Sequence, residues 1–207
     1  ESFTISSSKY SLIIIGDMIV FSISFGDVTA VDVESGFIIW QLATQSSSII
    51  NETYNLKTSK LVSDGNSIFI SNNKNEFHSI DVKTGTTNWI TDINSNITPV
   101  ITGNLIFTVS NEGYLYSIEK NKGNIIRVND LFKIYKQKKR KNIYPIGFAI
   151  GMKKLYLTNS DGKMIVVDLQ NGSIIKTEKV SSNLVSKPFI FNNNLFLVRN
   201  GSIIQFN

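Results

Sequence analysis

Residues 76–89 read EFHSIDVKTGTTNW, and residues 27–40 follow the same pattern as DVTAVDVESGFIIW. Each stretch has an aspartate four residues before a glycine and a tryptophan four residues after it. The pattern returns at residues 115–127 and 164–176. The shared positions are Asp32, Gly36 and Trp40; Asp81, Gly85 and Trp89; Glu119, Gly123 and Arg127; and Asp168, Gly172 and Lys176. Such self-similarity indicates one supersecondary unit that is used several times.

A second shared block, an apolar run after a Gly or Asn turn, precedes each copy. It covers residues 18–23, 67–71, 105–109 and 155–158, and a fifth block at 195–198 is followed by residues 201–207. Pro99, Pro145 and Pro188 all lie just before this block, as expected for a residue confined to strand starts and edges. The pattern of each repeat therefore predicts four short strands. No segment has a sustained 3.6-residue apolar period, so we expect almost no helix.

The acidic residue and the glycine predict a hairpin between the third and fourth strands of each unit. A type I turn followed by a glycine in the left-handed region closes such a loop, and the aspartate accepts hydrogen bonds from backbone N–H groups within it. The tryptophan four residues later is expected on the outer strand, against the neighbouring sheet. Loss of such a buried Trp typically costs about 3–5 kcal/mol.

The glycines at 36, 85, 123 and 172 place the repeats 49, 38 and 49 residues apart. Four-stranded units at this spacing predict an all-β protein, a β-propeller of antiparallel blades whose sheets bury both faces against their neighbours. We expect one propeller domain, or the C-terminal portion of one, over residues 1–207. Its blades are predicted at about 10–42, 58–91, 97–129, 143–179 and 185–207, with a further strand at 3–6 that completes a preceding or the last blade.

At these residues the sequence resembles the PQQ-type propeller repeat: a small residue, an apolar residue, Asp, two variable positions, Thr-Gly, three more positions and Trp. Residues 79–89 match best, and residues 30–40 are nearly as close. Arg127 and Lys176 replace the Trp in the later copies, so other contacts must hold those two interfaces. The family includes quinoprotein dehydrogenases and BamB, a lipoprotein of outer-membrane protein assembly. Both usually have about eight blades, so the resemblance implies a piece of a larger propeller, and a closed five-blade ring is the alternative.

The composition argues against an enzyme. The chain has no cysteine and a single histidine, His78, which excludes thiolate chemistry and the usual zinc and triad sites. His78 aligns with Thr29, Tyr116, Ile165 and Ile204, so we interpret it as a structural residue. The enzymes of the family need a quinone, a calcium ion and a catalytic Asp, whereas the repeat aspartates are interpreted as turn residues. We therefore expect no catalytic residue, no metal and no cofactor.

The positive charge is concentrated in one short stretch. The net charge is +5, and removing the six basic residues between 133 and 141 leaves −1 for the remainder. This run is a solvated insertion between two repeats, or a contact for an anionic surface. The residues of that contact would be Lys136, Lys138, Lys139, Arg140 and Lys141. The strands lack the interleaved aromatic and basic positions that bind nucleic acid, so no nucleic-acid partner is expected.

The longest apolar stretches, 12–15 and 18–21, are separated by Gly16 and Asp17, so no transmembrane segment is predicted. The preferred function is a BamB-like, non-catalytic scaffold that binds proteins through its propeller loops in the bacterial cell envelope. Its expected location is the periplasm, with an outer-membrane anchor through a lipidation site before residue 1. The alternatives are a fragment of a PQQ-dependent dehydrogenase, and a lumenal stress-sensor domain like those of unfolded-protein-response kinases.

Overall fold

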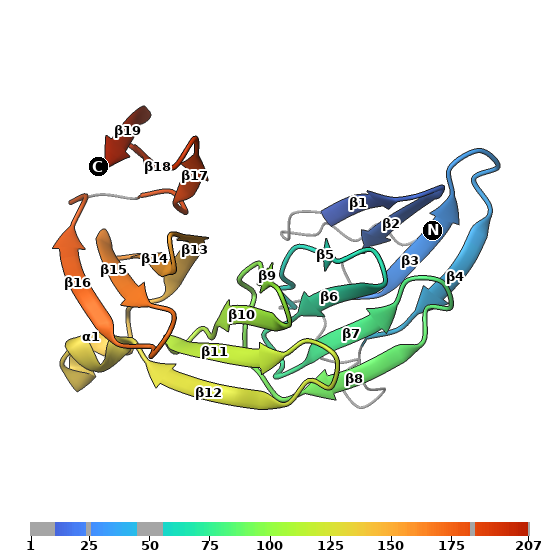
Figure 1. Cartoon of the computed structure of the whole chain (residues 1–207), viewed down its shortest axis with the longest axis horizontal. Coiled ribbons are helices and arrows are strands. Elements are labelled where there is room, and N and C mark those ends of the chain that lie inside the picture. The colour runs from blue at the N-terminus through green and yellow to red at the C-terminus, as the bar shows by residue number, and fades with distance from the viewer. Residues whose placement is uncertain (1–10, 24–25, 45–55, 183–184, 207) are drawn as a thin grey trace. The chain divides into compact units, whose positions relative to one another are not determined.

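The computed structural model describes residues 11–23, 26–44, 56–182 and 185–206. In this part of the chain there are five antiparallel sheets, four of them with four strands and the last with three (Figure 1). In each sheet the strands lie side by side in chain order. The prediction of an all-β fold built from repeated four-stranded sheets is confirmed. The strand expected at 3–6 lies outside the described residues.

The first sheet contains β1 (Ser11–Ile15), β2 (Met18–Ser22), β3 (Val28–Asp32) and β4 (Ile38–Leu42). The second contains β5 (Val62–Ser63), β6 (Ser67–Ser71), β7 (Phe77–Asp81) and β8 (Thr87–Thr91). The third contains β9 (Val100–Thr102), β10 (Leu105–Val109), β11 (Tyr114–Glu119) and β12 (Ile125–Asp130). The fourth contains β13 (Pro145–Gly151), β14 (Lys154–Asn159), β15 (Lys163–Asp168) and β16 (Ile174–Lys179). The fifth contains β17 (Phe189–Phe191), β18 (Asn194–Arg199) and β19 (Ser202–Phe206).

The chain divides into two compact units. The first comprises Glu1–Asn104 together with Glu119–Asn124, and it holds the first two sheets, β9 and the turn before β12. The second comprises Leu105–Ile118 and Ile125–Asn207, and it holds β10, most of β11, β12 and the last two sheets.

Each unit has an apolar core between neighbouring sheets. In the first unit the core lies between the first and second sheets; its buried members are Val20, Val28, Ala30, Trp40, Leu61, Ile68, Ile70, Ile80 and Val82. In the second unit a core lies between the fourth and fifth sheets; its buried members are Met164, Val166, Val180, Val185, Leu195 and Leu197. Since one sheet alone cannot bury both of its apolar faces, stacking of successive sheets supplies the core.

The hairpin that ends each of the first four sheets contains a β-bulge at the same place. The register shifts between Ala30 and Val31, and at the equivalent step in the other three hairpins. The glycine N–H then donates to the carbonyl of the acidic residue, at 2.8–3.0 Å in all four turns. A bulge and a left-handed glycine are the features that a five-residue hairpin turn requires.

The only helical residues among those described lie between β12 and β13. They form a 3₁₀ turn, η2 (Phe132–Ile134), and a single helical turn, α1 (Gln137–Arg140) (Figure 1). The sequence predicted a loop here, because seven residues hold too little pattern to show a helical period. The described part of the chain contains no helix with the length and hydropathy that a bilayer crossing requires.

Candidate functional site

The repeat carboxylates are used by their own turns. Oδ1 of Asp32 accepts hydrogen bonds from the backbone N–H of Ser35 at 2.8 Å and from its hydroxyl at 2.6 Å. Oδ1 of Asp81 accepts the same pair of bonds from Thr84, at 2.8 and 2.9 Å. These bonds hold the pKa of both carboxyls below the ordinary value for aspartate. Since Oδ1 of each carboxylate is bonded within its own turn, we interpret these aspartates as turn residues.

The fourth repeat has the same turn. There, Oδ1 of Asp168 accepts from the backbone N–H of Gln170 at 2.7 Å. In the third repeat the longer Glu119 instead accepts at Oε2 from the side-chain amide of Asn124 at 3.0 Å. The four turn glycines have φ values of 70°, 71°, 73° and 76°; they are Gly36, Gly85, Gly123 and Gly172.

The two tryptophans join successive repeats within the first unit. The indole N–H of Trp40 donates to the carbonyl oxygen of Val82 at 2.9 Å, and that of Trp89 donates to the carbonyl oxygen of Lys120 at 2.9 Å. Both carbonyls belong to the residue directly after the acidic position of the next repeat. The repeat residues therefore form a latch, defined here as a side chain on the last strand of one repeat bonded to the turn of the next.

The turn glycine makes room for the latch. A Cβ atom on Gly85 would lie 2.5 Å from Cδ2 of Trp40, and one on Gly123 would lie 2.5 Å from Cδ2 of Trp89. Real Cβ atoms do not approach a ring so closely, and the backbone there has positive φ as well. The second tryptophan is also held from its own sheet, because its ring stacks on Phe77 with centroids 5.7 Å apart.

Arg127 forms the latch in the second unit in place of tryptophan. Its Nη2 donates to the carbonyl oxygen of Leu169 at 2.6 Å and its Nη1 to that of Gln170 at 2.7 Å. Leu169 again follows the acidic residue of the next repeat. The side-chain amide of Asn129 fills the space over Gly172 that an indole ring occupies elsewhere. The guanidinium of Arg127 thus takes the place of the indole N–H as the donor to the equivalent carbonyl oxygen of the next repeat.

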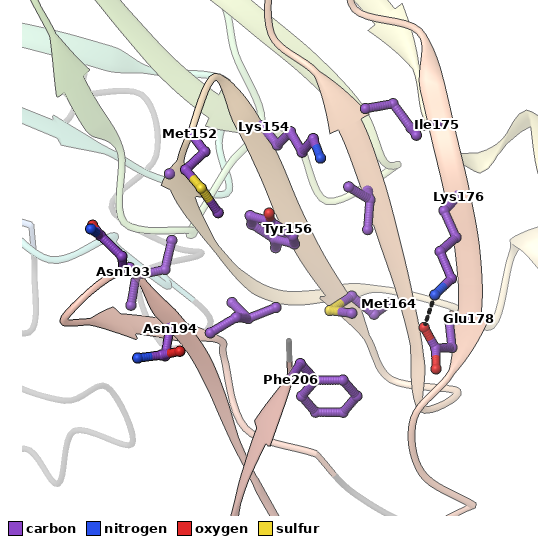
Figure 2. A pocket seen from close by; sticks show the side chains of 14 residues that line it. Met152, Lys154, Tyr156, Met164, Ile175, Lys176, Glu178, Asn193, Asn194 and Phe206 are labelled. Atoms are coloured by element: carbon purple, nitrogen blue, oxygen red, sulfur yellow. Dashed lines mark ion pairs between the residues drawn. The ribbon is translucent and has the colours of Figure 1, made fainter.

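Lys176, the last residue in this series, makes a different contact. Its Nζ lies 2.7 Å from Oε2 of Glu178 on the same strand, as Figure 2 shows. Both side chains line a cavity of about 560 Å³ between the fourth and fifth sheets. Tyr156, Met164 and Phe206 give the cavity an apolar wall. This cavity was not predicted from the sequence, because its walls come from two sheets and no single stretch of sequence marks it.

The basic run is divided between internal contacts and solvent. Arg140 Nη1 pairs with Asp130 Oδ2 at 2.7 Å, and Lys139 Nζ lies 3.4 Å from Oδ2 of Asp161. The other three predicted surface residues are exposed; they are Lys136, Lys138 and Lys141. The structure thus uses two of the five residues to hold the segment and leaves three accessible.

His78 lies in β7 with 4% of its surface exposed. Burial lowers its pKa, although the carboxylate of Glu76, 3.8 Å from Nε2, opposes this effect. A neutral, buried imidazole of this kind is typical of a packing residue. Within the described ranges, no three His, Cys, Asp or Glu side chains are grouped closely enough to hold a metal ion.

A family model described as outer membrane protein assembly factor BamB matches residues 2–129. The chain belongs to this family. A search of curated proteins found no match.

Solved structures with the same fold cover nearly the whole chain. BamB from Moraxella catarrhalis is 16% identical with a TM-score of 0.54, over 94% of this chain and 67% of that one. The computationally designed Ika8 protein is 14% identical with a TM-score of 0.71, over 93% of this chain and 56% of that one. The β-propeller domain of Cps50 (Swd1) from Myceliophteria thermophila is 13% identical with a TM-score of 0.69, over 95% and 63%. The chain is thus shorter than each of these three chains, and at such identities the likeness shows the fold alone.

Proposed function

We propose that this BamB-family chain is part of a non-catalytic propeller scaffold that binds partner proteins in the periplasm of a bacterium, during outer-membrane protein assembly. The proposal rests on the observation that the repeat residues form structural hydrogen bonds. Their carboxylates, indoles and guanidinium are bonded within turns and latches, which leaves the loops as the variable surface. Loops on a rigid scaffold are where propellers present their binding residues.

The turns at one end of the sheets carry exposed apolar side chains, and these are our candidates for partner contacts. In the first unit the β3–β4 turn exposes 77% of Phe37. In the second unit the β13–β14 turn exposes 71% of Met152, and Phe191, at the end of β17, is 65% exposed. At the other end of the fourth and fifth sheets the turns are polar, with the sequences Ser160-Asp161-Gly162 and Asn200-Gly201. Exposed apolar groups on a rigid turn favour protein contacts.

The alternative of a quinone-dependent dehydrogenase is less well supported. A bound quinone needs calcium held by carboxylate and amide ligands, and the repeat aspartates are already bonded within their turns. We expect that the purified chain, incubated with pyrroloquinoline quinone and calcium, elutes from gel filtration without a bound chromophore. A stoichiometric quinone signal in the protein peak would favour the dehydrogenase instead.

Binding to the purified outer-membrane protein assembly complex of the same bacterium tests the scaffold directly. Biolayer interferometry with the immobilised chain is expected to give saturable binding. The triple variant Phe37→Ser, Met152→Ser, Phe191→Ser should weaken binding at least tenfold. The control variant Ile39→Ser, Ile90→Ser, Ile126→Ser removes exposed isoleucines from outer strands and should bind as the parent does. Equal loss in both variants, or no binding by the parent, would contradict the proposal.

A further inference from the structure

The segment of residues 131–144, called here the basic loop, is held firmly at its start. Phe132 is fully buried, and its ring lies directly against Gly113 of the β10–β11 turn. Its backbone N–H donates to Oδ1 of Asp130 at 3.0 Å. The loop is therefore anchored where it leaves β12.

Tyr135 provides the central anchor. Only 7% of it is exposed, and its hydroxyl donates to Oδ1 of Asp161 at 3.0 Å and accepts from Nδ2 of Asn159 at 3.2 Å. Burial raises the pKa of this hydroxyl far above its ordinary value, so it remains a donor at any physiological pH. The ring also packs edge-on against Phe132, with centroids 5.4 Å apart. The loop is thus fastened to the β14–β15 turn.

Arg140 closes the arrangement on the other side of α1. Beyond its ion pair with Asp130, it donates from Nη2 to the carbonyl oxygen of Glu112 at 3.2 Å, and its guanidinium lies 5.0 Å from the ring centroid of Tyr114. The anchors therefore fix both the course of the loop and the direction in which α1 points.

The remaining basic residues are left at the surface. Lys133, Lys136, Lys138 and Lys141 are exposed, and none of them is paired with an acidic side chain among the described residues. The loop contains no acidic residue, and the charge of the chain outside residues 133–141 is −1. The positive field of the molecule is therefore concentrated on this loop.

Apolar groups accompany these lysines. Ile134 is 36% exposed beside the first lysine, and Tyr144 is 54% exposed at the end of the loop. An aromatic ring with a polar tip and an aliphatic side chain, next to lysines, is a combination suited to the boundary between lipid headgroups and acyl chains.

We propose that the basic loop docks the propeller onto an anionic phospholipid bilayer. The four lysines lie among headgroup phosphates, while Ile134 and Tyr144 enter the interfacial layer. A bilayer fits better than an acidic protein, because flexible lysines with compact charges suit a diffuse field and the loop offers no free arginine fork. Because the anchors already order the loop, docking costs little further conformational entropy. The inference goes beyond the scaffold function and does not depend on which proteins bind.

The arrangement of the sheets makes the two contacts compatible. The basic loop contacts the β10–β11 and β14–β15 turns. Met152 lies at the other end of the fourth sheet, across the seven residues of β13, which is roughly 20 Å at the usual rise per residue. A bilayer at the loop leaves that protein-binding turn accessible.

Vesicle sedimentation tests the proposal with purified protein. The chain is expected to sediment with phosphatidylcholine vesicles that contain one-third phosphatidylglycerol at low ionic strength, and not with phosphatidylcholine alone. The variant Lys133→Gln, Lys136→Gln, Lys138→Gln, Lys141→Gln should lower partitioning roughly fivefold per lysine removed, and hence by a factor of several hundred. High salt should have the same effect on the parent.

The matched control is Lys57→Gln, Lys60→Gln, Lys122→Gln, Lys153→Gln, which removes four exposed lysines elsewhere and gives the same net charge. It should retain the partitioning of the parent within about twofold. Ile134→Ser with Tyr144→Ser should weaken partitioning several-fold while the salt dependence remains. No binding of the parent to anionic vesicles, or equal loss in both lysine variants, would overturn the proposal. Stronger binding to soluble poly-glutamate than to vesicles would also overturn it, in favour of an acidic protein.

Discussion

Arg127 Nη2 donates a 2.6 Å hydrogen bond to the carbonyl oxygen of Leu169, at the position where an indole N–H is the donor in the two preceding repeats. The carbonyl after the acidic turn residue is thus the fixed element of the latch. The donor varies between repeats, from a ring in the first two to a guanidinium in the third. This explains how a repeat can lose its tryptophan and keep its packing against the next sheet.

The latch predicts that Arg127→Ala destabilises the chain by about 1–3 kcal/mol, because two carbonyls lose a charged donor. Arg127→Lys should be intermediate, since an ammonium cannot bond both carbonyls in the fork geometry. Urea denaturation gives the free energies of unfolding. Lys176→Ala, which removes only an exposed pair with Glu178, serves as the control and should stay within about 0.5 kcal/mol. If the two alanine variants are equally stable, the latch contributes nothing.

Gly85 and Gly36 allow the packing of the latch to be separated from backbone strain. Their φ values are 71° and 70°, so alanine meets the same left-handed penalty of about 1–2 kcal/mol at either site. Only Gly85 is covered by a ring, because nothing lies within 4 Å of the Cβ position at Gly36. Gly85→Ala should therefore lose a further ~1–3 kcal/mol from overpacking. Thermal unfolding of both variants measures the difference, and similar melting temperatures would disprove contact with Trp40.

Because His78 is buried, we expect the free energy of unfolding to depend on pH. Its pKa in the folded chain lies below the ordinary value of about 6.5, so the unfolded chain takes up the proton more readily. The free energy of unfolding should therefore fall as the pH drops below about 6.5, by at most about 1.4 kcal/mol per pH unit, until the folded-state pKa is passed. His78→Ile, which introduces the residue that the last two repeats carry at the same position, should reduce this slope between about pH 6.5 and 5. An unchanged slope would assign the effect to other groups.

The repeat spacing predicted the sheets because every copy carries its own turn. An acidic residue and a glycine four positions apart determine a hairpin locally, and local information is readable from one sequence. From the sequence, Trp40 and Trp89 were expected to pack their rings against the neighbouring sheet. The hydrogen bonds that their indole N–H groups donate were not predicted. The carbonyls that accept from them lie 42 and 31 residues away, and such pairings need the stacked sheets.

The basic loop shows where sequence analysis stops. The charge of the loop was evident from the sequence. Its contacts with the rest of the chain were not, because Lys139 and Tyr135 contact Asp161, which lies in the distant β14–β15 turn. The helical turn α1 was not predicted either, because four residues are too few to show a helical period. Its stability comes from tertiary anchors, which the sequence does not reveal. The cavity beside Lys176 depends on two sheets at once and has no local signature.

The central claim is that the chain acts by presenting its turns to proteins of the outer-membrane assembly process. Site-specific photocrosslinking in living cells is the sharpest test. Three single variants carry the photoreactive residue at position 37, at position 152, or at position 90 on an outer strand. We expect the two turn positions to crosslink to components of the assembly complex, and we expect no crosslink from position 90. Crosslinking from position 90 alone, or from none of the three, would contradict it.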